Sequence, residues 1–252
     1  MGEKGYFALS KLSKNQPSEQ QKSKRVVFCK RHEDKTPDDW KHALEAVGDV
    51  KEYTWYPVEL RAKFNQLRAS WTYMNDKERY QGAFQRPKRW FPKKEWDTTR
   101  HQRVFGMTTS TGKILTFLVP KPWTSEDWAI KLEKKVAPFL KKCFPNKRDF
   151  VILLDGEPLL HAPPAKRSMA KFGISVLPGW PKYSAELNPQ ENVWPKGEVI
   201  LRDLEKPGDS FETFQKNVEK AVRMYPSPEK LVPSMTKRVK ECLERGGDPL
   251  RK

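Results

Sequence analysis

Two acidic residues, Asp155 and Glu191, are the first side chains in this sequence whose surroundings point to chemistry. Asp155 directly follows Phe150–Leu154, an apolar run too short for a helix, which predicts a carboxylate at the end of a buried strand. Glu191 follows Asn188 and Pro189, an arrangement typical of the first turn of a helix. Carboxylate oxygens are the ligands that Mg²⁺ prefers. The two acids are therefore candidates for a divalent-metal site.

Each acid also has an ordinary structural explanation when it is considered alone. A glutamate three residues after a capping asparagine commonly accepts a hydrogen bond from the backbone of the cap residue. An aspartate at the end of a strand is commonly part of a turn. The residues around both acids are needed to choose between a structural and a chemical role.

Three segments within residues 155–194 form an ordered pattern. They read DGEPLLH from Asp155 to His161, LPGWPKYS from Leu177 to Ser184 and LNPQENVW from Leu187 to Trp194. This order resembles the second half of the catalytic domain of mariner-superfamily transposases, which reads D-N-A-x-x-H and then L-P-x-Y-S-P-D-L-N-P-I-E-N-x-W. The chain keeps both carboxylates and departs from the pattern at three places: Gly156-Glu157 for Asn-Ala, Ala185-Glu186 for Pro-Asp, and Gln190 for Ile.

The resemblance implies both a fold and an activity. The implied fold is α/β and ribonuclease H-like: a mixed sheet of three antiparallel strands followed by crossover strands, flanked by helices, with extra C-terminal helices. The implied activity is that of a metal-dependent DNA endonuclease and strand transferase, in which two aspartates and a glutamate hold two Mg²⁺ ions, or Mn²⁺ in their place. The partners would be DNA, as transposon ends and target, and a second copy of the chain, because two ends must be joined.

The first of the three acids is expected at Asp49. The run from Gly48 to Pro57 is rich in aromatic and β-branched residues and ends on proline, which predicts a strand. The resembled family usually has adjacent Asp and Glu at this point, whereas the nearest following glutamate here is Glu52. Asp76 is a further alternative for the first acid, and Asp49 could also be an ordinary acid on a surface strand.

Cleavage and transfer of a phosphodiester explain why three acids are wanted. The attacking oxygen must lose a proton, the leaving oxygen must be stabilised, and two metal ions about 4 Å apart achieve both. Asp49 and Asp155, on neighbouring strands, would flank the ions, and Glu191 would complete the second ion's site from its helix. Without a cation, three clustered carboxylates would repel one another and perturb each other's pKa.

Three neighbours of the acids are candidates for contact with DNA. His161 matches the histidine of the family pattern and could contact the cleaved strand or orient a carboxylate; it could equally be an ordinary histidine on a helix face. Lys182 and Tyr183 lie in the loop before Glu191 and are candidates to contact phosphates.

The whole chain is strongly basic, which favours a polyanionic partner. Its 252 residues carry a formal net charge of +17, with a pI of about 9.7. Binding to phosphates releases counterions, so nucleic acid is favoured, but charge alone does not separate enzymes from structural binders. Three distant cysteines argue against a disulfide framework or a zinc cluster. The sequence has no apolar leader and no run of membrane-spanning length, which predicts an intracellular protein, nuclear in a eukaryote, with no membrane partner.

A basic segment at residues 86–103 has aromatic residues among its charges. It carries seven Lys or Arg against two acids. Basic side chains hold phosphates, and exposed aromatic rings stack on unpaired bases. We expect DNA contact here; the alternatives are a solvated charged loop whose rings enter the core, and a nuclear-import signal. The candidate DNA-binding residues are Lys88, Arg89, Trp90, Lys93 and Lys94.

The chain is predicted to divide into an arm and one domain. Residues 1–37, rich in Ser, Gln, Lys and Asn, are expected to be a basic flexible arm with a β-capable patch at Val26–Phe28. Residues 38–252 are expected to form the ribonuclease H-like domain. The resembled family carries a helix-turn-helix ahead of this domain, and the short arm leaves no room for one. We therefore expect that module to be absent or supplied elsewhere.

Hydrophobic periodicity and turn residues predict the elements of this domain. In order, these are a helix at 36–47, a strand at 48–57, a helix at 58–70, a hairpin at 104–119, a helix at 125–143, strands at 150–154 and 173–177, a helix from 188 to about 205, and helices within 209–252.

Three functions are compatible with these features. The first is a mariner-like transposase that cuts and joins DNA. The second is a domesticated or decayed transposase that binds DNA without cutting it, which the departures near Ala185 and Asp49 and the missing helix-turn-helix would explain. The third is a related ribonuclease H-like nuclease that acts on RNA or hybrids.

Overall fold

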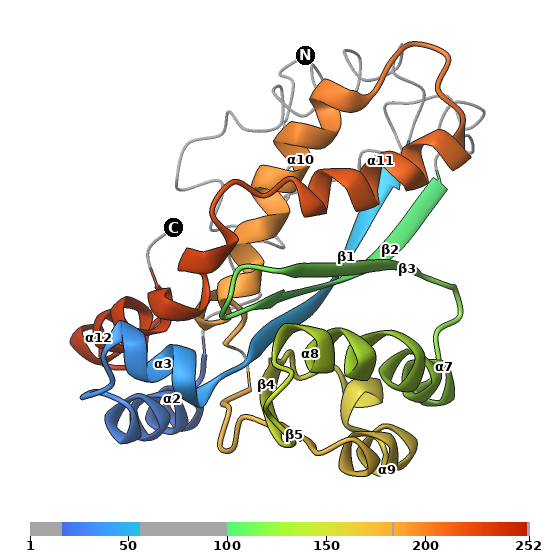
Figure 1. The fold of residues 1–252 in the computed structure, drawn as a ribbon. Coiled ribbons are helices and arrows are strands. Elements are labelled where there is room, and N and C mark those ends of the chain that lie inside the picture. Colours follow the sequence, from blue (N-terminus) through green and yellow to red (C-terminus); the bar gives the residue numbers. More distant parts are fainter. Residues whose placement is uncertain (1–16, 56–99, 183, 251–252) are drawn as a thin grey trace, which may run out of the picture.

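A mixed sheet of five strands forms the centre of the molecule. The computed structural model describes residues 17–55, 100–182 and 184–250 (Figure 1). The strand order is β3-β2-β1-β4-β5, in which β1, β2 and β3 pair antiparallel and β4 and β5 continue the sheet in parallel. This confirms the predicted α/β, ribonuclease H-like sheet of three antiparallel strands followed by crossover strands. The bounds are β1 (Ala46–Trp55), β2 (Arg100–Thr109), β3 (Ile114–Val119), β4 (Phe150–Leu154) and β5 (Ile174–Val176).

The hairpin between β2 and β3 forms where the sequence predicts it. Gly112 has a φ of 78°, in the left-handed region that favours glycine. The backbone N–H of Thr109 donates to the carbonyl of Lys113 at 2.9 Å, and the N–H of Lys113 donates to the Thr109 hydroxyl at 2.9 Å. The turn residues therefore fix the register of the two strands.

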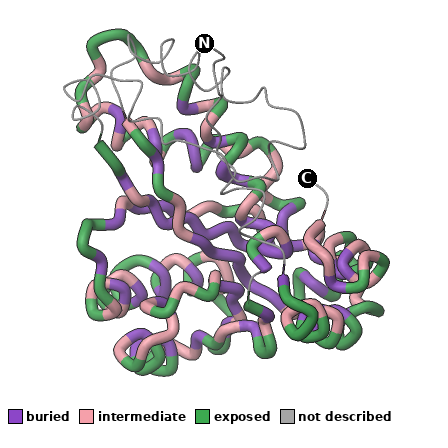
Figure 2. The backbone as a smooth tube through the Cα atoms, turned by 180° about the vertical axis from the view of Figure 1, so that it is seen from behind, coloured by how far each residue is buried: buried purple, intermediate pink, exposed green. Residues whose placement is uncertain are grey.

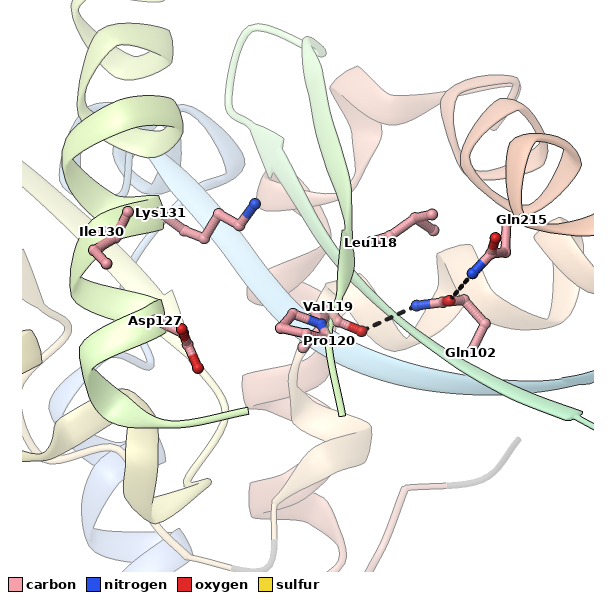
Figure 3. A pocket seen from close by; sticks show the side chains of 8 residues that line it. All are labelled: Gln102, Leu118, Val119, Pro120, Asp127, Ile130, Lys131 and Gln215. Atoms are coloured by element: carbon pink, nitrogen blue, oxygen red, sulfur yellow. Dashed lines mark hydrogen bonds between the residues drawn. The ribbon is translucent and has the colours of Figure 1, made fainter. Parts of the chain in front are cut away.

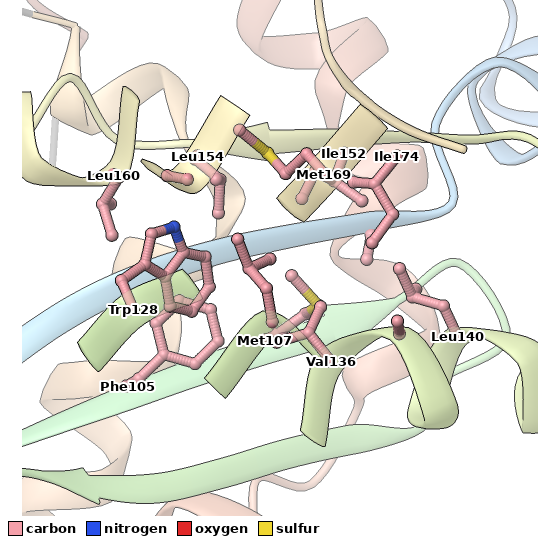
Figure 4. Close-up of a cluster of buried hydrophobic side chains, with 14 of the residues drawn as sticks. Phe105, Met107, Trp128, Val136, Leu140, Ile152, Leu154, Leu160, Met169 and Ile174 are labelled. Atoms are coloured by element: carbon pink, nitrogen blue, oxygen red, sulfur yellow. The ribbon is translucent and has the colours of Figure 1, made fainter. Parts of the chain in front are cut away.

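One face of the sheet is covered by three helices that enclose an apolar cluster (Figure 4). Phe105 and Met107 of β2 and Ile152 of β4 pack there against the fully buried Trp128 and Val136. The helices are α7 (Ser125–Lys131), α8 (Ala137–Cys143) and α9 (Pro163–Lys171). A π-helical turn, η2 (Leu132–Val136), joins α7 to α8, so the predicted helix at 125–143 is one continuous element.

The opposite face carries two groups of helices, with the buried strands between the layers (Figures 1 and 2). One group packs on β1 and β2 through a cluster that includes Tyr53, Val104, Trp194 and Phe214. The other packs on β1 and β4, at the far end of the sheet. The first group is α10 (Val193–Leu204) and α11 (Phe211–Arg223); the second is α2 (Glu19–Arg31), α3 (Pro37–Ala43) and α12 (Met235–Glu244).

The expectation of a flexible arm is wrong for Glu19–Arg31, which is helix α2. Ser18 and Gln21 form a capping box at its start. Phe28 is 2% exposed and Arg25 is completely buried. The helix escapes a sequence search because its sequence is mostly polar and one of its buried residues is an arginine. The β-capable patch at Val26–Phe28 is part of this helix.

Two further boundaries differ from expectation. The helix expected to reach Val47 ends at Ala43, because Leu44 takes an extended conformation and the buried run that follows joins the sheet as β1. The predicted helix at 58–70, Asp76 and residues 86–99 of the basic segment lie outside the described residues. Within the described residues, no helix has the length and apolar character needed to span a bilayer.

Candidate active site

Asp49 lies in the middle of β1 and is buried, with 4% of its surface exposed. The backbone N–H of Val50 donates to its Oδ1 at 2.7 Å. The indole Nε1 of Trp194, on α10, donates to its Oδ2 at 2.8 Å. Each carboxylate oxygen thus accepts one hydrogen bond, which fixes the orientation of the group and leaves further lone pairs on both oxygens.

Asp155 follows β4 by one residue, and the sheet register brings it level with Asp49. Gly48 pairs with Leu154 in the parallel register of β1 and β4. Asp49 and Asp155 are the residues that follow this pair, and neighbouring strands lie about 4.8 Å apart, so the backbones of the two acids start from adjacent points of the sheet. A Cβ on Gly48 would meet Leu154 and Phe105, on the face covered by α7 to α9. Because side chains alternate along a strand, Asp49 belongs to the other face.

His161 supports the backbone at Asp155. It lies at the end of the 3₁₀ turn η3 (Pro158–His161), and its Nε2 is 2.7 Å from the carbonyl oxygen of Asp155. A carbonyl only accepts, so Nε2 carries the proton in this contact. The contact is with the backbone of Asp155 and not with its carboxylate.

Glu191 is delivered by a short 3₁₀ turn, η5 (Pro189–Asn192), and not by the first turn of an α-helix, which begins only at Val193. Asn188 caps this turn by accepting a hydrogen bond from the backbone N–H of Gln190 at 3.1 Å. The Nδ2 of Asn188 donates to the carbonyl of Gly48 at 3.2 Å. The cap residue therefore also ties the segment that carries Glu191 to β1, next to Asp49.

The charges of Glu191 and Asp155 both act on Asp49. The pKa of Asp49 is raised to about 7: burial is the largest cause, the negative charges of Glu191 and Asp155 add to it, and the hydrogen bonds from Trp194 and Val50 oppose it. Both acids are therefore close enough to Asp49 for their charges to disfavour its ionisation.

The side chains of the three acids are not arranged as a complete set of metal ligands. Among the residues that the structure describes, no group of three or more His, Cys, Asp or Glu side chains is arranged to hold a metal ion. Charge interactions reach well beyond a metal–oxygen bond of about 2 Å, so the two observations are compatible. The donors are all carboxylates, which fits a hard divalent cation, and such a cation would offset the repulsion that now raises the pKa of Asp49.

Two arginines, the buried Arg25 and the half-buried Arg238, hold the loop that precedes Glu191. Arg25 of α2 pairs with the carboxylate of Glu186 and donates to the hydroxyl of Ser184 at 3.0 Å. Arg238 of α12 donates to the carbonyl of Glu186. Burial lowers the pKa of the Arg238 guanidinium, and the charge of Glu191 is among those that oppose this shift. The loop is thereby held between the first and the last described α-helices.

Comparisons with known proteins can be set against this geometry. No protein-family model matches the chain, and no curated protein matches it in sequence. Solved structures do match. A pre-cleavage Mos1 transpososome aligns with a TM-score of 0.63 and 15% identity, over 93% of this chain and 65% of that chain. The Mos1 transposase catalytic domain with raltegravir and Mn aligns with a TM-score of 0.61 and 14% identity, over 93% of this chain and 98% of that chain.

The chain has the fold of the Mos1 transposase catalytic domain. A mariner Mos1 paired-end complex with Mg gives a similar result, with a TM-score of 0.62, 16% identity, and coverage of 92% of this chain and 63% of that chain. The chain thus spans nearly all of the Mos1 catalytic domain and less than two thirds of the transposase chains in these DNA complexes. At such identities the likeness extends to the fold alone.

Several residues that the sequence suggested for the site are not found at the three acids. Others lie outside the described residues. Lys182 is exposed on the loop before Glu191. Glu52 lies on β1 three residues after Asp49, so it faces the other side of the sheet, where it pairs with Lys121 at 3.6 Å. The candidates outside the described residues are Tyr183, Lys88, Arg89, Trp90, Lys93, Lys94 and the alternative acid Asp76.

The sequence did not predict the polar contacts beneath the candidate site. Gln190 is completely buried, and its Oε1 accepts a hydrogen bond from the Thr108 hydroxyl at 2.9 Å. Trp194 lies in the helix predicted from residue 188, and its indole donates a hydrogen bond to Asp49. The pattern N-P-x-E-N-x-W contains both positions, but nothing local to it identifies their partners on β1 and β2.

A surface cleft of about 500 Å³ lies between α7, the end of β3 and α11 (Figure 3). On one side of it, Gln102 donates to the carbonyl of Val119 at 3.0 Å and accepts a hydrogen bond from Gln215. None of the three acids lines this cleft. It is therefore separate from the candidate active site of the Mos1-like fold.

Proposed function

We propose that this chain is the catalytic domain of a mariner-like DNA transposase, a metal-dependent endonuclease and strand transferase. The observation that carries the proposal is the juxtaposition of Asp49 with Asp155 and Glu191, whose charges both act on it within a Mos1-like fold. The Mos1 structures are described with Mg, with Mn and with transposon ends. Those properties belong to Mos1 and support the proposal by likeness.

Asp49, Asp155 and Glu191 would hold two Mg²⁺ ions, or Mn²⁺ in their place. When bound, the ions would supply Lewis acidity at the phosphate and lower the pKa of the attacking hydroxyl or water. The protein's own part is to hold the acids in position: Trp194 and Val50 orient Asp49, His161 holds the backbone of Asp155, and Asn188 anchors the turn that bears Glu191.

DNA is the proposed substrate, and a second copy of the chain the proposed partner. The net charge of +17 favours a polyanion, because binding to phosphates releases counterions. Lys182, exposed on the loop before Glu191, and the basic segment at residues 86–103 are the proposed phosphate contacts. Two chains would be needed to bring two DNA ends together. In a eukaryotic host the protein would act in the nucleus.

Cleavage assays with matched acidic variants test the proposal. The chain is incubated with supercoiled plasmid and labelled duplexes in Mg²⁺ or Mn²⁺, alongside Asp49→Asn, Asp155→Ala, Glu191→Ala and Glu52→Ala. Cleavage should be lost in the first three variants and kept in Glu52→Ala, because Glu52 is an acid on the same strand that faces away from the site. Equal cleavage in all four variants would overturn the assignment. Parallel RNA and RNA–DNA hybrid substrates test the ribonuclease alternative.

A DNA-binding protein without catalysis is the second candidate. Its supporting observations are the absence, among the described residues, of a group arranged to hold a metal and the departures Gly156-Glu157 and Ala185-Glu186 from the family pattern. Calorimetric titration with Mn²⁺ separates the two. Heat that disappears in Asp155→Ala supports the nuclease, whereas no heat from the unaltered chain, together with retained DNA binding, supports the binder.

A further inference from the structure

Trp194 connects the helix that follows Glu191 to the first acid. Its side chain is 1% exposed, and its Nε1 donates to the Oδ2 of Asp49 at 2.8 Å. Glu191 lies three residues earlier in the chain, on the turn that leads into α10. One side chain therefore links the strand that holds the first acid to the helical segment that holds the third.

The indole can reach Asp49 because the neighbouring strand has no side chain at the facing position. Gly106 of β2 pairs with Asp49 across the sheet. A Cβ on Gly106 would lie 2.6 Å from Cη2 of Trp194 and 2.9 Å from Nε2 of Gln190. Contacts this short are not tolerated in a packed interior, so any side chain at Gly106 would displace the ring.

Burial alone does not require this hydrogen bond. Trp40, Trp123 and Trp128 are also buried, and within the described residues each has an indole N–H without a hydrogen-bond partner. This fold therefore accommodates buried indoles that donate to nothing. Trp194 differs from them in that its donor is directed at a carboxylate of the candidate site.

Two further contacts hold the same segment against the sheet. Asn188 donates to the carbonyl of Gly48, and Thr108 donates to the side chain of Gln190. These contacts fix the height of the segment above β1 and β2. Of these three contacts, the hydrogen bond from Trp194 is the one made to a proposed metal ligand.

We propose that Trp194 is a positioning residue that sets the orientation of the Asp49 carboxylate toward Asp155 and Glu191. This inference rests on the proposed function, because it concerns the geometry in which the acids receive divalent cations. Residues that hydrogen-bond to a metal ligand typically contribute a factor of roughly 10 to 100 in metal affinity. Trp194 acts through Asp49 and has no direct contact with substrate in this account.

The test compares Trp194→Phe with Trp128→Phe. Both variants remove an indole from the core and keep an aromatic ring, but only the first removes a hydrogen bond to Asp49. We expect Trp194→Phe to weaken Mn²⁺ binding in calorimetry by roughly tenfold or more. The Mg²⁺ concentration for half-maximal cleavage should rise by a similar factor. The cleavage rate at saturating metal should change much less, and so should the affinity for DNA measured in EDTA. A general loss of structure would lower all of these quantities together.

A second variant reaches the same bond from another element. Gly106→Ala alters neither the indole nor any acid, yet its methyl group would push the Trp194 ring away, so it should reproduce the metal-affinity loss of Trp194→Phe. Should Gly106→Ala fail to fold, the comparison of Trp194→Phe with Trp128→Phe still tests the positioning role. Equal metal affinity of Trp194→Phe and Trp128→Phe, with an active unaltered chain, would overturn the positioning role alone. An unaltered chain that neither binds Mn²⁺ nor cleaves DNA would overturn the proposed function, and this inference with it.

Discussion

Arg25 is buried against Glu186, although 160 residues of chain lie between them. The same guanidinium donates to the carbonyl of Gly247 at 2.7 Å. It thus joins an N-terminal helix, the loop before Glu191 and the turn after α12. A charged group this deeply buried is stable only while its partners remain in place.

Replacement of Arg25 should therefore be costly. Arg25→Met leaves the Glu186 carboxylate without its buried partner, and we expect the free energy of unfolding to fall by about 3–5 kcal/mol. Urea denaturation followed by circular dichroism measures this. Lys22→Met is the matched control, because Lys22 on the same helix pairs with Asp248 at 2.9 Å near the surface, where solvent screens the pair, and its loss should destabilise the protein far less. Equal losses in the two variants would contradict a special role for Arg25.

Stability of the metal-free protein should depend on the protonation of Asp49. Because the folded state raises the pKa of this acid from 3.8 to about 7, its stabilising contribution is fully present below pH 4 and is lost as the pH rises through 7. The loss should approach about 1.4 kcal/mol per pH unit inside that window. Urea denaturation in EDTA at pH 5, 6, 7 and 8 measures it. Asp49→Asn should lack this slope, and a slope unchanged in the variant would refute the assignment.

Metal binding should release a proton below pH 7. A divalent cation favours the ionised form of Asp49, which in the metal-free protein is largely protonated at pH 6. Titration with Mn²⁺ at pH 6 in two buffers of different ionisation enthalpy should give heats that correspond to about one proton per binding event. At pH 8 the difference between buffers should vanish. The same heats in both buffers at pH 6 would show that Asp49 is already ionised.

Thiol labelling should distinguish the three cysteines. Cys29 of α2 and Cys242 of α12 are completely buried, whereas Cys143, at the end of α8, is half-buried. Burial also raises the pKa of the Cys143 thiol, so its reaction should be slow but still first. Under native conditions Ellman's reagent should label one thiol, and Cys143→Ser should abolish that phase. Rapid labelling of all three would mean that α2 and α12 separate in solution.

The parts of the fold that follow local rules could be predicted from sequence. The apolar run before Asp155, the hairpin around Gly112 and the helix after Thr124 each carry their own signals of period, turn or cap, and each lies where expected. Helix α2 could not be found this way. Its buried surface includes Arg25, whose partners Glu186 and Gly247 lie far away in the chain, and no local pattern marks a buried ion pair.

The candidate site likewise has parts that the sequence predicts and parts that it does not. Asp155 and Glu191 follow from strand-end and helix-start signals together with the family pattern. The choice of Asp49 over Glu52 needed the sheet, because alternation along β1 turns only Asp49 toward the other acids. The contact from Trp194 to Asp49 depends on the register that sets Gly106 opposite Asp49, and register is a property of strand pairing that a single segment does not encode.

The attachment of α2 and the turn after α12 to a single guanidinium has a practical consequence for protein engineering. A tag or reporter joined ahead of Ser18 and one joined behind Leu250 would emerge from the same corner of the molecule, near the loop that leads to the acids. A pair of fluorophores at these two points would therefore report loosening of that corner as a drop in energy transfer, without any label at the three acids themselves.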